Sequence, residues 1–226
     1  MQLSHTKKFI LLKTIKTAST STGVFFQPYC VPDDALYIDY DRYGPPLVTD
    51  AGILSTRSTY MAKKYGWYIH TPAYKLQYFL RDYWDSYFKF TNIRNTFDTI
   101  VSFWWFAWAV HQKDLDFSAM PFESIAKIFQ QMVCEQHFSD SYIPASTYYS
   151  INKKIAVDFC IRQEHYVRDT KEVCDRLDIP FTLDEKFRYK DMRLNSTHFS
   201  KYYNNETADV VYRNFKFEID HFGYSV

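Results

Sequence analysis

A run of small hydroxyl residues follows an apolar, β-prone segment at 8–14 near the start of the chain. It comprises Lys16, Thr17, Ala18, Ser19, Thr20 and Ser21. Phe25 and Phe26 then precede Pro28, so the pattern predicts a strand, a tight loop and a helix that ends before this proline. The start of such a helix can hold a phosphate through its N–H groups and its dipole. Hydroxyls and one lysine would assist here.

The same run has a plainer explanation as a Ser/Thr-rich turn with a helix N-cap, and alone it favours neither use. It does not match the Walker A pattern G-x-x-x-x-G-K-[ST], so the main sequence evidence for ATP or GTP hydrolysis is missing.

A second candidate phosphate receptor combines Arg94 with Ser102. Arg94 follows a predicted strand at 87–93, and Ser102 lies eight residues later on a predicted helix at 96–110. Ligands of parallel sheets bind at the carboxyl ends of strands, which is the edge expected to carry the Lys16 run. An arginine and a hydroxyl suit a phosphate. The alternative is a surface ion pair between Arg94 and Asp98, with an incidental serine.

Together, the two segments resemble the donor-binding elements of PAPS-dependent carbohydrate sulfotransferases. KTASTS at 16–21 is most similar to the loop of the heparan sulfate 2-O-sulfotransferases. The stretch 87–105 is similar to the family's 3′-phosphate element, with Thr96 in place of the usual proline. The resemblance continues at 156–164 and 202–224, whereas 29–66 matches no family segment and is the expected place of substrate choice.

The resemblance implies a sulfuryl transfer from PAPS to a hydroxyl of a sugar or other small acceptor, with adenosine 3′,5′-bisphosphate as the product and no metal. It implies that Lys16 neutralises charge on the leaving oxygen, while 17–21 bind the 5′ end of the donor. Arg94 and Ser102 would bind the 3′-phosphate. Two other functions stay open: a P-loop-like kinase of a small metabolite, and a non-catalytic nucleotide-binding relative.

His70 is the best-placed of the seven histidines to take the acceptor proton. It ends a short predicted strand at 67–70, just before a helix expected to begin at Pro72. Similar family members carry a histidine in this interval. The alternative is a structural histidine, in which case Glu164 becomes a further candidate base.

The order of strands and helices predicts one α/β domain over 1–226, with a P-loop-like sulfotransferase fold and an irregular excursion at about 29–66. The strand runs at 8–14, 87–93 and 155–161 alternate with helical patterns. This alternation favours a central, mainly parallel sheet with helices on both faces.

Composition narrows the set of partners. The 27 Lys and Arg nearly balance the 26 Asp and Glu, so the chain lacks the overall positive field of a protein that coats nucleic acid. The apolar run at 101–110 is too short to span a bilayer, and lysines interrupt the first 15 residues, unlike an export signal. Four scattered cysteines indicate no zinc site or disulfide framework. We expect a cytoplasmic protein without nucleic-acid or membrane partners.

Overall fold

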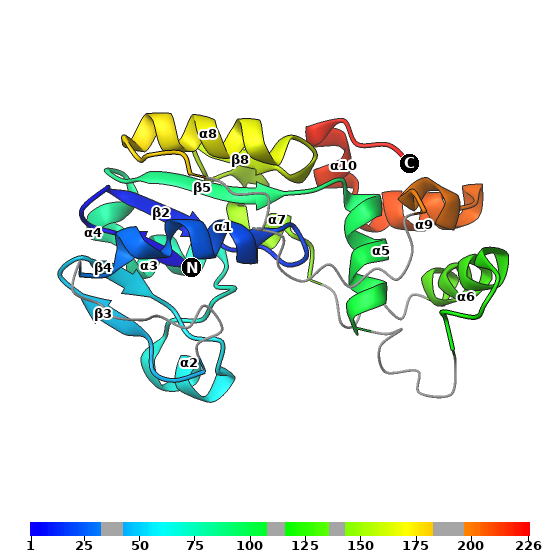
Figure 1. Ribbon diagram of the computed structural model, residues 1–226, viewed down its shortest axis with the longest axis horizontal. Helices are drawn as coiled ribbons and strands as arrows, with labels where there is room; N and C mark the ends of the chain where they lie inside the picture. The colour runs from blue at the N-terminus through cyan, green and yellow to red at the C-terminus, as the bar shows by residue number, and fades with distance from the viewer. Residues whose placement is uncertain (33–42, 108–115, 136–142, 183–196) are drawn as a thin grey trace. The chain divides into compact units, whose positions relative to one another are not determined.

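The computed structural model describes residues 1–32, 43–107, 116–135, 143–182 and 197–226. The chain divides into two compact units, each described by itself (Figure 1). The first consists of Met1–Ile93 and Ala145–Tyr189, and the second of Arg94–Pro144 and Lys190–Val226. The expectation of a single domain stays a prediction.

A six-stranded sheet runs through the first unit, with the order β3-β4-β1-β2-β5-β8. Its strands are β1 (Gln2–Ser4), β2 (Phe9–Leu12), β3 (Leu47–Thr49), β4 (Gly52–Leu54), β5 (Phe88–Ile93) and β8 (Phe159–Arg162). β2 pairs with β5 and β5 with β8 in parallel, but the pairs β1–β2, β1–β4 and β3–β4 are antiparallel. The α/β class is therefore confirmed, and the prediction of a mainly parallel sheet is wrong.

Two of the three antiparallel pairs are tight hairpins, and the third joins β1 to β4. β1 turns back into β2 through 5–8, where Lys8 has a left-handed φ of 51°. β3 and β4 form the second hairpin, inside the stretch predicted as an irregular excursion, of which 33–42 lie outside the described residues. Gly52 permits β4 to approach β1, because any Cβ there would collide with the carbonyl oxygen of Leu3. Hairpin connections of this length allow only antiparallel neighbours.

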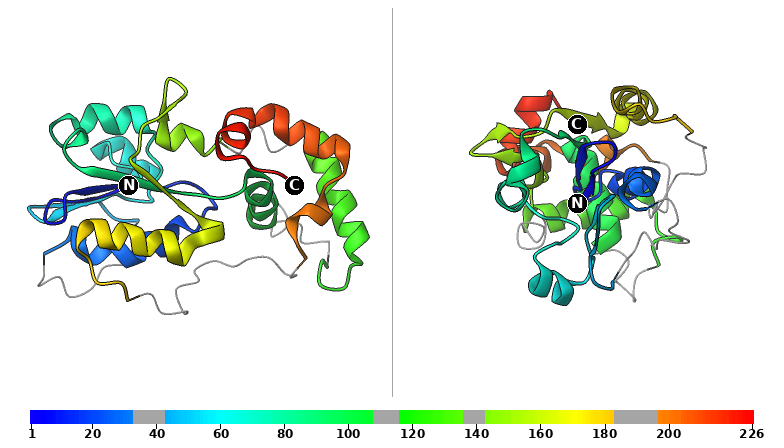
Figure 2. Two further views of the ribbon diagram at one scale, coloured as in Figure 1. Left: turned by 90° about the horizontal axis from the view of Figure 1, so that it is seen from above. Right: turned by 90° about the vertical axis from the view of Figure 1, so that its left-hand side faces the viewer.

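Helices cover both faces of this sheet, as predicted (Figure 2). Alternate side chains of β2 point to opposite faces, so Phe9 and Leu11 join one core and Ile10 and Leu12 another. The first core contains side chains of α1 (Ser19–Phe26) and α8 (Tyr166–Leu177). The second contains those of α3 (Ala73–Phe79) and α4 (Arg81–Trp84).

Most expected elements appear with shifted ends. The strand runs at 8–14 and 87–93 form β2 and β5, and Pro72 precedes α3 as its N-cap. The predicted strand at 67–70 is absent from the described residues; Tyr68 makes only an isolated bridge with Thr56 before a turn. The remaining elements of this unit are η1 (Gln27–Cys30), α2 (Thr59–Tyr65), α7 (Ser146–Tyr149), β6 (Ser150–Ile151), β7 (Lys154–Ile155) and η3 (Gln163–His165).

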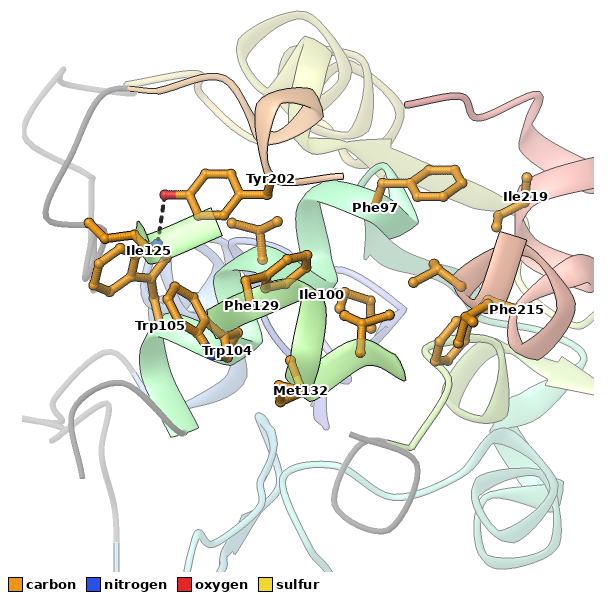
Figure 3. Close-up of a cluster of buried hydrophobic side chains, with 14 of the residues drawn as sticks. Phe97, Ile100, Trp104, Trp105, Ile125, Phe129, Met132, Tyr202, Phe215 and Ile219 are labelled. Carbon is orange, nitrogen blue, oxygen red and sulfur yellow. Dashed lines mark hydrogen bonds between the residues drawn. The ribbon is translucent and has the colours of Figure 1, made fainter. Parts of the chain in front are cut away.

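In the second unit, the secondary structure of the described residues is all helical. It contains α5 (Thr96–Ala107), α6 (Phe122–Cys134), η4 (Phe199–Tyr202), α9 (Asn205–Asn214) and α10 (Lys216–Phe222). Its core gathers aromatic side chains around Trp104, and the indole N–H of Trp105 donates to the Tyr202 hydroxyl at 3.1 Å (Figure 3). The last two helices, α9 and α10, are separated at Phe215.

Within the described ranges, no helix has the length and apolar character needed to cross a membrane.

Candidate functional site

The Lys16 run forms the connection from β2 to α1, at the carboxyl end of a strand with a parallel neighbour. Its polar side chains divide into a buried group, to which Ser21 also belongs, and a partly exposed group. Thr17 and Ser19 are buried and fold the loop: the Thr17 hydroxyl lies 2.6 Å from that of Thr14, and Ser19 Oγ donates to the Thr14 carbonyl at 2.5 Å. Lys16 and Thr20 are half-exposed. The buried pair therefore shapes the loop, and the partly exposed pair can contact a ligand.

Two residues of this loop hold the left-handed conformation without being glycine. The φ angle is 61° at Lys16 and 65° at Ala18. Each such residue costs roughly 1 to 2 kcal/mol, and such outliers cluster at functional sites. The loop persists in this form because the surrounding hydrogen bonds determine it.

The start of α1 is open to an anion. Its N-cap is Ala18, which has no side chain able to accept from the first N–H groups, and its first turn contains no acidic residue. The Thr22 N–H donates to the Ala18 carbonyl oxygen at 3.2 Å. An uncapped helix start without a carboxylate favours negative charge through its N–H groups and its dipole.

A buried polar network ties the loop to the sheet. Thr14 Oγ1 donates to the carbonyl oxygen of Asn92 on β5 at 2.6 Å. The side-chain amide of Asn92 donates to Thr22 Oγ1 at 2.8 Å, and Thr22 in turn contacts the hydroxyl of Tyr166 on α8 at 3.1 Å. Burial raises the pKa of Tyr166, so this phenol stays neutral. Asn92, Thr22 and Tyr166 belong to no motif that the sequence alone indicates.

His70 lies at the base of the same loop. Its Nδ1 is 2.9 Å from the carbonyl oxygen of Lys13, three residues before Lys16, and the rings of Tyr68 and Tyr148 flank it at 6.0 and 5.9 Å. Burial lowers the pKa of His70 to about 3; the positive charges of the Met1 amino group, Lys13 and Arg57 act in the same direction, and the hydrogen bond to Lys13 opposes them. His70 is therefore neutral near pH 7.

Lys13 is a second cation near the loop that the sequence analysis did not single out. It is buried, and its ammonium lies over α1, since a Cβ on Gly23 would be 2.5 Å from its Nζ. Glycine at 23 makes room for this side chain. A lysine at the end of an apolar strand gives no sign of burial in sequence, whereas the glycine inside a predicted helix was an available signal.

Arg94 and Ser102 belong to the second unit, on and just before α5. Arg94 Nε donates to Asp98 Oδ2 at 2.7 Å, and both side chains are largely buried. This is the ion pair weighed as the alternative, although it is not on the surface. Ser102 is half-buried on α5. Lys16 and His70 share the first unit, so a joint receptor of all four residues stays a prediction.

Among the described residues, no group of three or more His, Cys, Asp or Glu side chains is arranged to hold a metal ion. Comparisons of the chain with models of known protein families, with curated proteins and with solved structures found no match.

Proposed function

We propose that the protein is a PAPS-dependent sulfotransferase that acts on a hydroxyl of a sugar or another small acceptor. The proposal depends on one observation above all: the Lys16 loop leads from a parallel strand into a helix whose first turn is uncapped and free of carboxylates. The sequence resemblance to the sulfotransferase donor loop falls on these same residues, 16–21.

The residues of the first unit have distinct roles in this proposal. The first N–H groups of α1, with Thr20, bind the 5′ end of the donor, which supplies the sulfuryl group. Lys16 stabilises negative charge on the oxygen that leaves, the kind of charge on which loose group transfers depend most. Arg94 and Ser102 hold the 3′-phosphate.

His70 accepts the proton of the acceptor hydroxyl at Nε2. A carbonyl oxygen only accepts hydrogen bonds, so the contact with Lys13 fixes the proton on Nδ1 and leaves the lone pair on Nε2. The orientation and the neutral state suit a base. Its low pKa weakens the driving force for proton transfer, so positioning and Lys16 carry much of the rate in this proposal.

That low pKa of His70 also favours a second candidate function, a nucleotide-binding protein without turnover. It uses the same loop and differs only in the absence of sulfate transfer. A P-loop-like kinase has weaker support, because the Walker glycines are missing.

Thermal unfolding with adenosine 3′,5′-bisphosphate, AMP and ATP tests the donor site. At about 100 times its Kd, the bisphosphate adds roughly 2.7 kcal/mol to the free energy of unfolding, and ATP, which has no 3′-phosphate, adds far less. Equal shifts from all three nucleotides contradict the 3′-phosphate assignment. Lys16→Ala abolishes the shift, and Lys153→Ala, an exposed lysine elsewhere in the same unit, keeps it.

Transfer of radiolabelled sulfate from PAPS to a panel of hydroxylated acceptors separates the two candidates. A sulfotransferase forms sulfated product, and His70→Ala lowers turnover by about 10² to 10⁴ with donor affinity nearly unchanged. His221→Ala, an exposed histidine of α10, is the matched control. Donor binding without product on any acceptor favours the non-catalytic candidate.

A further inference from the structure

Positive charge is unevenly distributed along the chain. Residues 51–81 contain no Asp or Glu, but they include five cations: Arg57, Lys63, Lys64, Lys75 and Arg81. Arg81 lies 3.9 Å from the carboxylate of Asp82, just beyond this stretch. Lys63, Lys64 and Lys75 are exposed on α2 and α3, and none of the three has an ion-pair partner in the described parts of the chain. A net charge near zero for the whole protein hides this local excess.

The same stretch exposes large side chains of one kind only. Tyr78 is 73% exposed and Tyr74 54%, and the other exposed large apolar side chains between 51 and 81 are also aromatic: Tyr60, Tyr65 and Phe79. The exposed aliphatic side chains Val48, Ile143, Val167 and Val226 lie elsewhere. Helix α2 has no buried residue at all. Exposed apolar side chains gathered in one part of a chain can mark an interaction site, whereas singly scattered ones are normal.

These rings and lysines lie on α2, on α3 and on the short segment between the two helices. Tyr74 and Tyr78 are four residues apart on α3, as are Lys75 and Phe79, so each pair shares a helix face. The Phe79 ring contacts Tyr78 at 5.6 Å and Trp67 at 5.5 Å, and Trp67 directly follows the Gly66 C-cap of α2. We call Lys63, Lys64, Tyr74, Lys75, Tyr78 and Phe79 the aromatic–lysine face.

We infer that the aromatic–lysine face binds single-stranded nucleic acid. Proteins that bind single strands combine lysines along the phosphate backbone with exposed rings on which bases stack. Both features are present here, and no carboxylate of residues 51–81 opposes a phosphate. A bilayer surface fits less well, because interfacial helices insert aliphatic as well as aromatic side chains. The inference stands apart from the proposed sulfotransferase function.

Fluorescence anisotropy with a labelled 20-mer of deoxythymidine, added to the full chain, tests the inference. With one phosphate contact from each of the three lysines, affinity falls about 20-fold between 50 and 200 mM salt. Lys63→Gln with Lys64→Gln removes two contacts, so the slope of log K against log salt becomes shallower by about 1.4. Lys153→Gln with Lys154→Gln, an exposed pair on the β6–β7 hairpin, leaves the slope unchanged.

Stacking is tested separately from charge. Tyr78→Ala weakens binding by about fivefold or more, since a stacked base is worth about 1 kcal/mol at least. Tyr212→Ala, on α9 in the second unit, leaves affinity unchanged. Both tyrosines are exposed, so each variant folds as the parent does, and circular dichroism verifies it.

Three results overturn the inference. The first is absence of binding at 50 mM salt. The second is inorganic polyphosphate competing as well as the oligonucleotide while Tyr78→Ala has no effect, which describes a patch for any polyanion. The third is binding of phosphatidylserine vesicles or of an acidic peptide by a protein that does not bind the oligonucleotide. That result assigns the face to a lipid surface or a protein partner.

Discussion

The ring Nδ1 of His70 lies 2.9 Å from the main-chain carbonyl oxygen of Lys13, so the candidate base and the candidate donor loop are joined by a hydrogen bond. The bond involves the backbone of Lys13 and not its side chain. The ring is therefore oriented by the path of the chain after β2, which also places Lys16 three residues later. Displacement of either segment moves the other.

Replacing His70 by Asn changes how stability depends on pH. The pKa of His70 is about 3 in the folded chain and about 6.5 when unfolded, so below pH 6.5 only the unfolded chain takes up the proton. The neutral His70 ring therefore makes its full contribution to the free energy of unfolding above pH 6.5, and this contribution is lost as pH falls toward 3. Between pH 7 and pH 5, urea unfolding shows the parent losing about 2 kcal/mol more than His70→Asn. If the free energies of unfolding of the parent and of His70→Asn change with pH in the same way, the pKa of His70 is not lowered in the folded chain.

Thr22→Val leaves the buried amide of Asn92 without its contact and removes one contact of the Tyr166 hydroxyl. Unsatisfied buried groups cost about 1 to 3 kcal/mol each, so the midpoint of urea unfolding falls. Thr22→Ser keeps the hydroxyl and serves as the control, with a loss under about 1 kcal/mol. If the two variants are equally stable, the network contributes nothing beyond packing.

Ala18→Gly stabilises the fold by up to about 1 kcal/mol, because glycine adopts a φ of 65° without the steric cost that alanine bears. The control is Ala62→Gly inside α2, where the same replacement destabilises by roughly 1 kcal/mol. Chemical denaturation measures both. A loss of stability in both variants would mean that the loop relaxes away from the left-handed conformation in solution.

Arg94→Ala weakens binding of adenosine 3′,5′-bisphosphate by about ten- to a hundredfold, the scale of a hydrogen bond to a charged group. Affinity for AMP changes little, because AMP has no 3′-phosphate. Calorimetry with both nucleotides gives the comparison, and Arg213→Ala on α9 is the control. Unchanged bisphosphate affinity in a folded variant assigns Arg94 to its ion pair with Asp98 alone.

The sequence predicted the elements whose signals are local. The apolar runs that became β2 and β5, and the hydroxyl-rich turn into α1, are each readable within about ten residues. The antiparallel half of the sheet could not be predicted in this way. Its strands β1, β3 and β4 have three residues each, too few to show an alternation of apolar and polar residues. A strand of that length is defined by its partners.

The site was predictable to the same extent. The Lys16 loop and His70 were found as separate segments, but their link through the Lys13 carbonyl spans 57 residues of sequence. Lys13 is buried, and burial lowers the pKa of His70 although that hydrogen bond acts in the opposite direction. Both are consequences of three-dimensional packing that no residue pattern encodes.

The mixed topology of the sheet also sets an order of events during folding. The β1–β2 and β3–β4 hairpins close over a few residues, whereas the bond from Thr14 to Asn92 spans 78 and the contact from Thr22 to Tyr166 spans 144. Because the entropic cost of loop closure delays distant pairings, the hairpins form early and β5 and α8 arrive late. A nascent chain released before α8 is synthesised would therefore hold an assembled antiparallel half and a Lys16 loop that lacks its lasting shape.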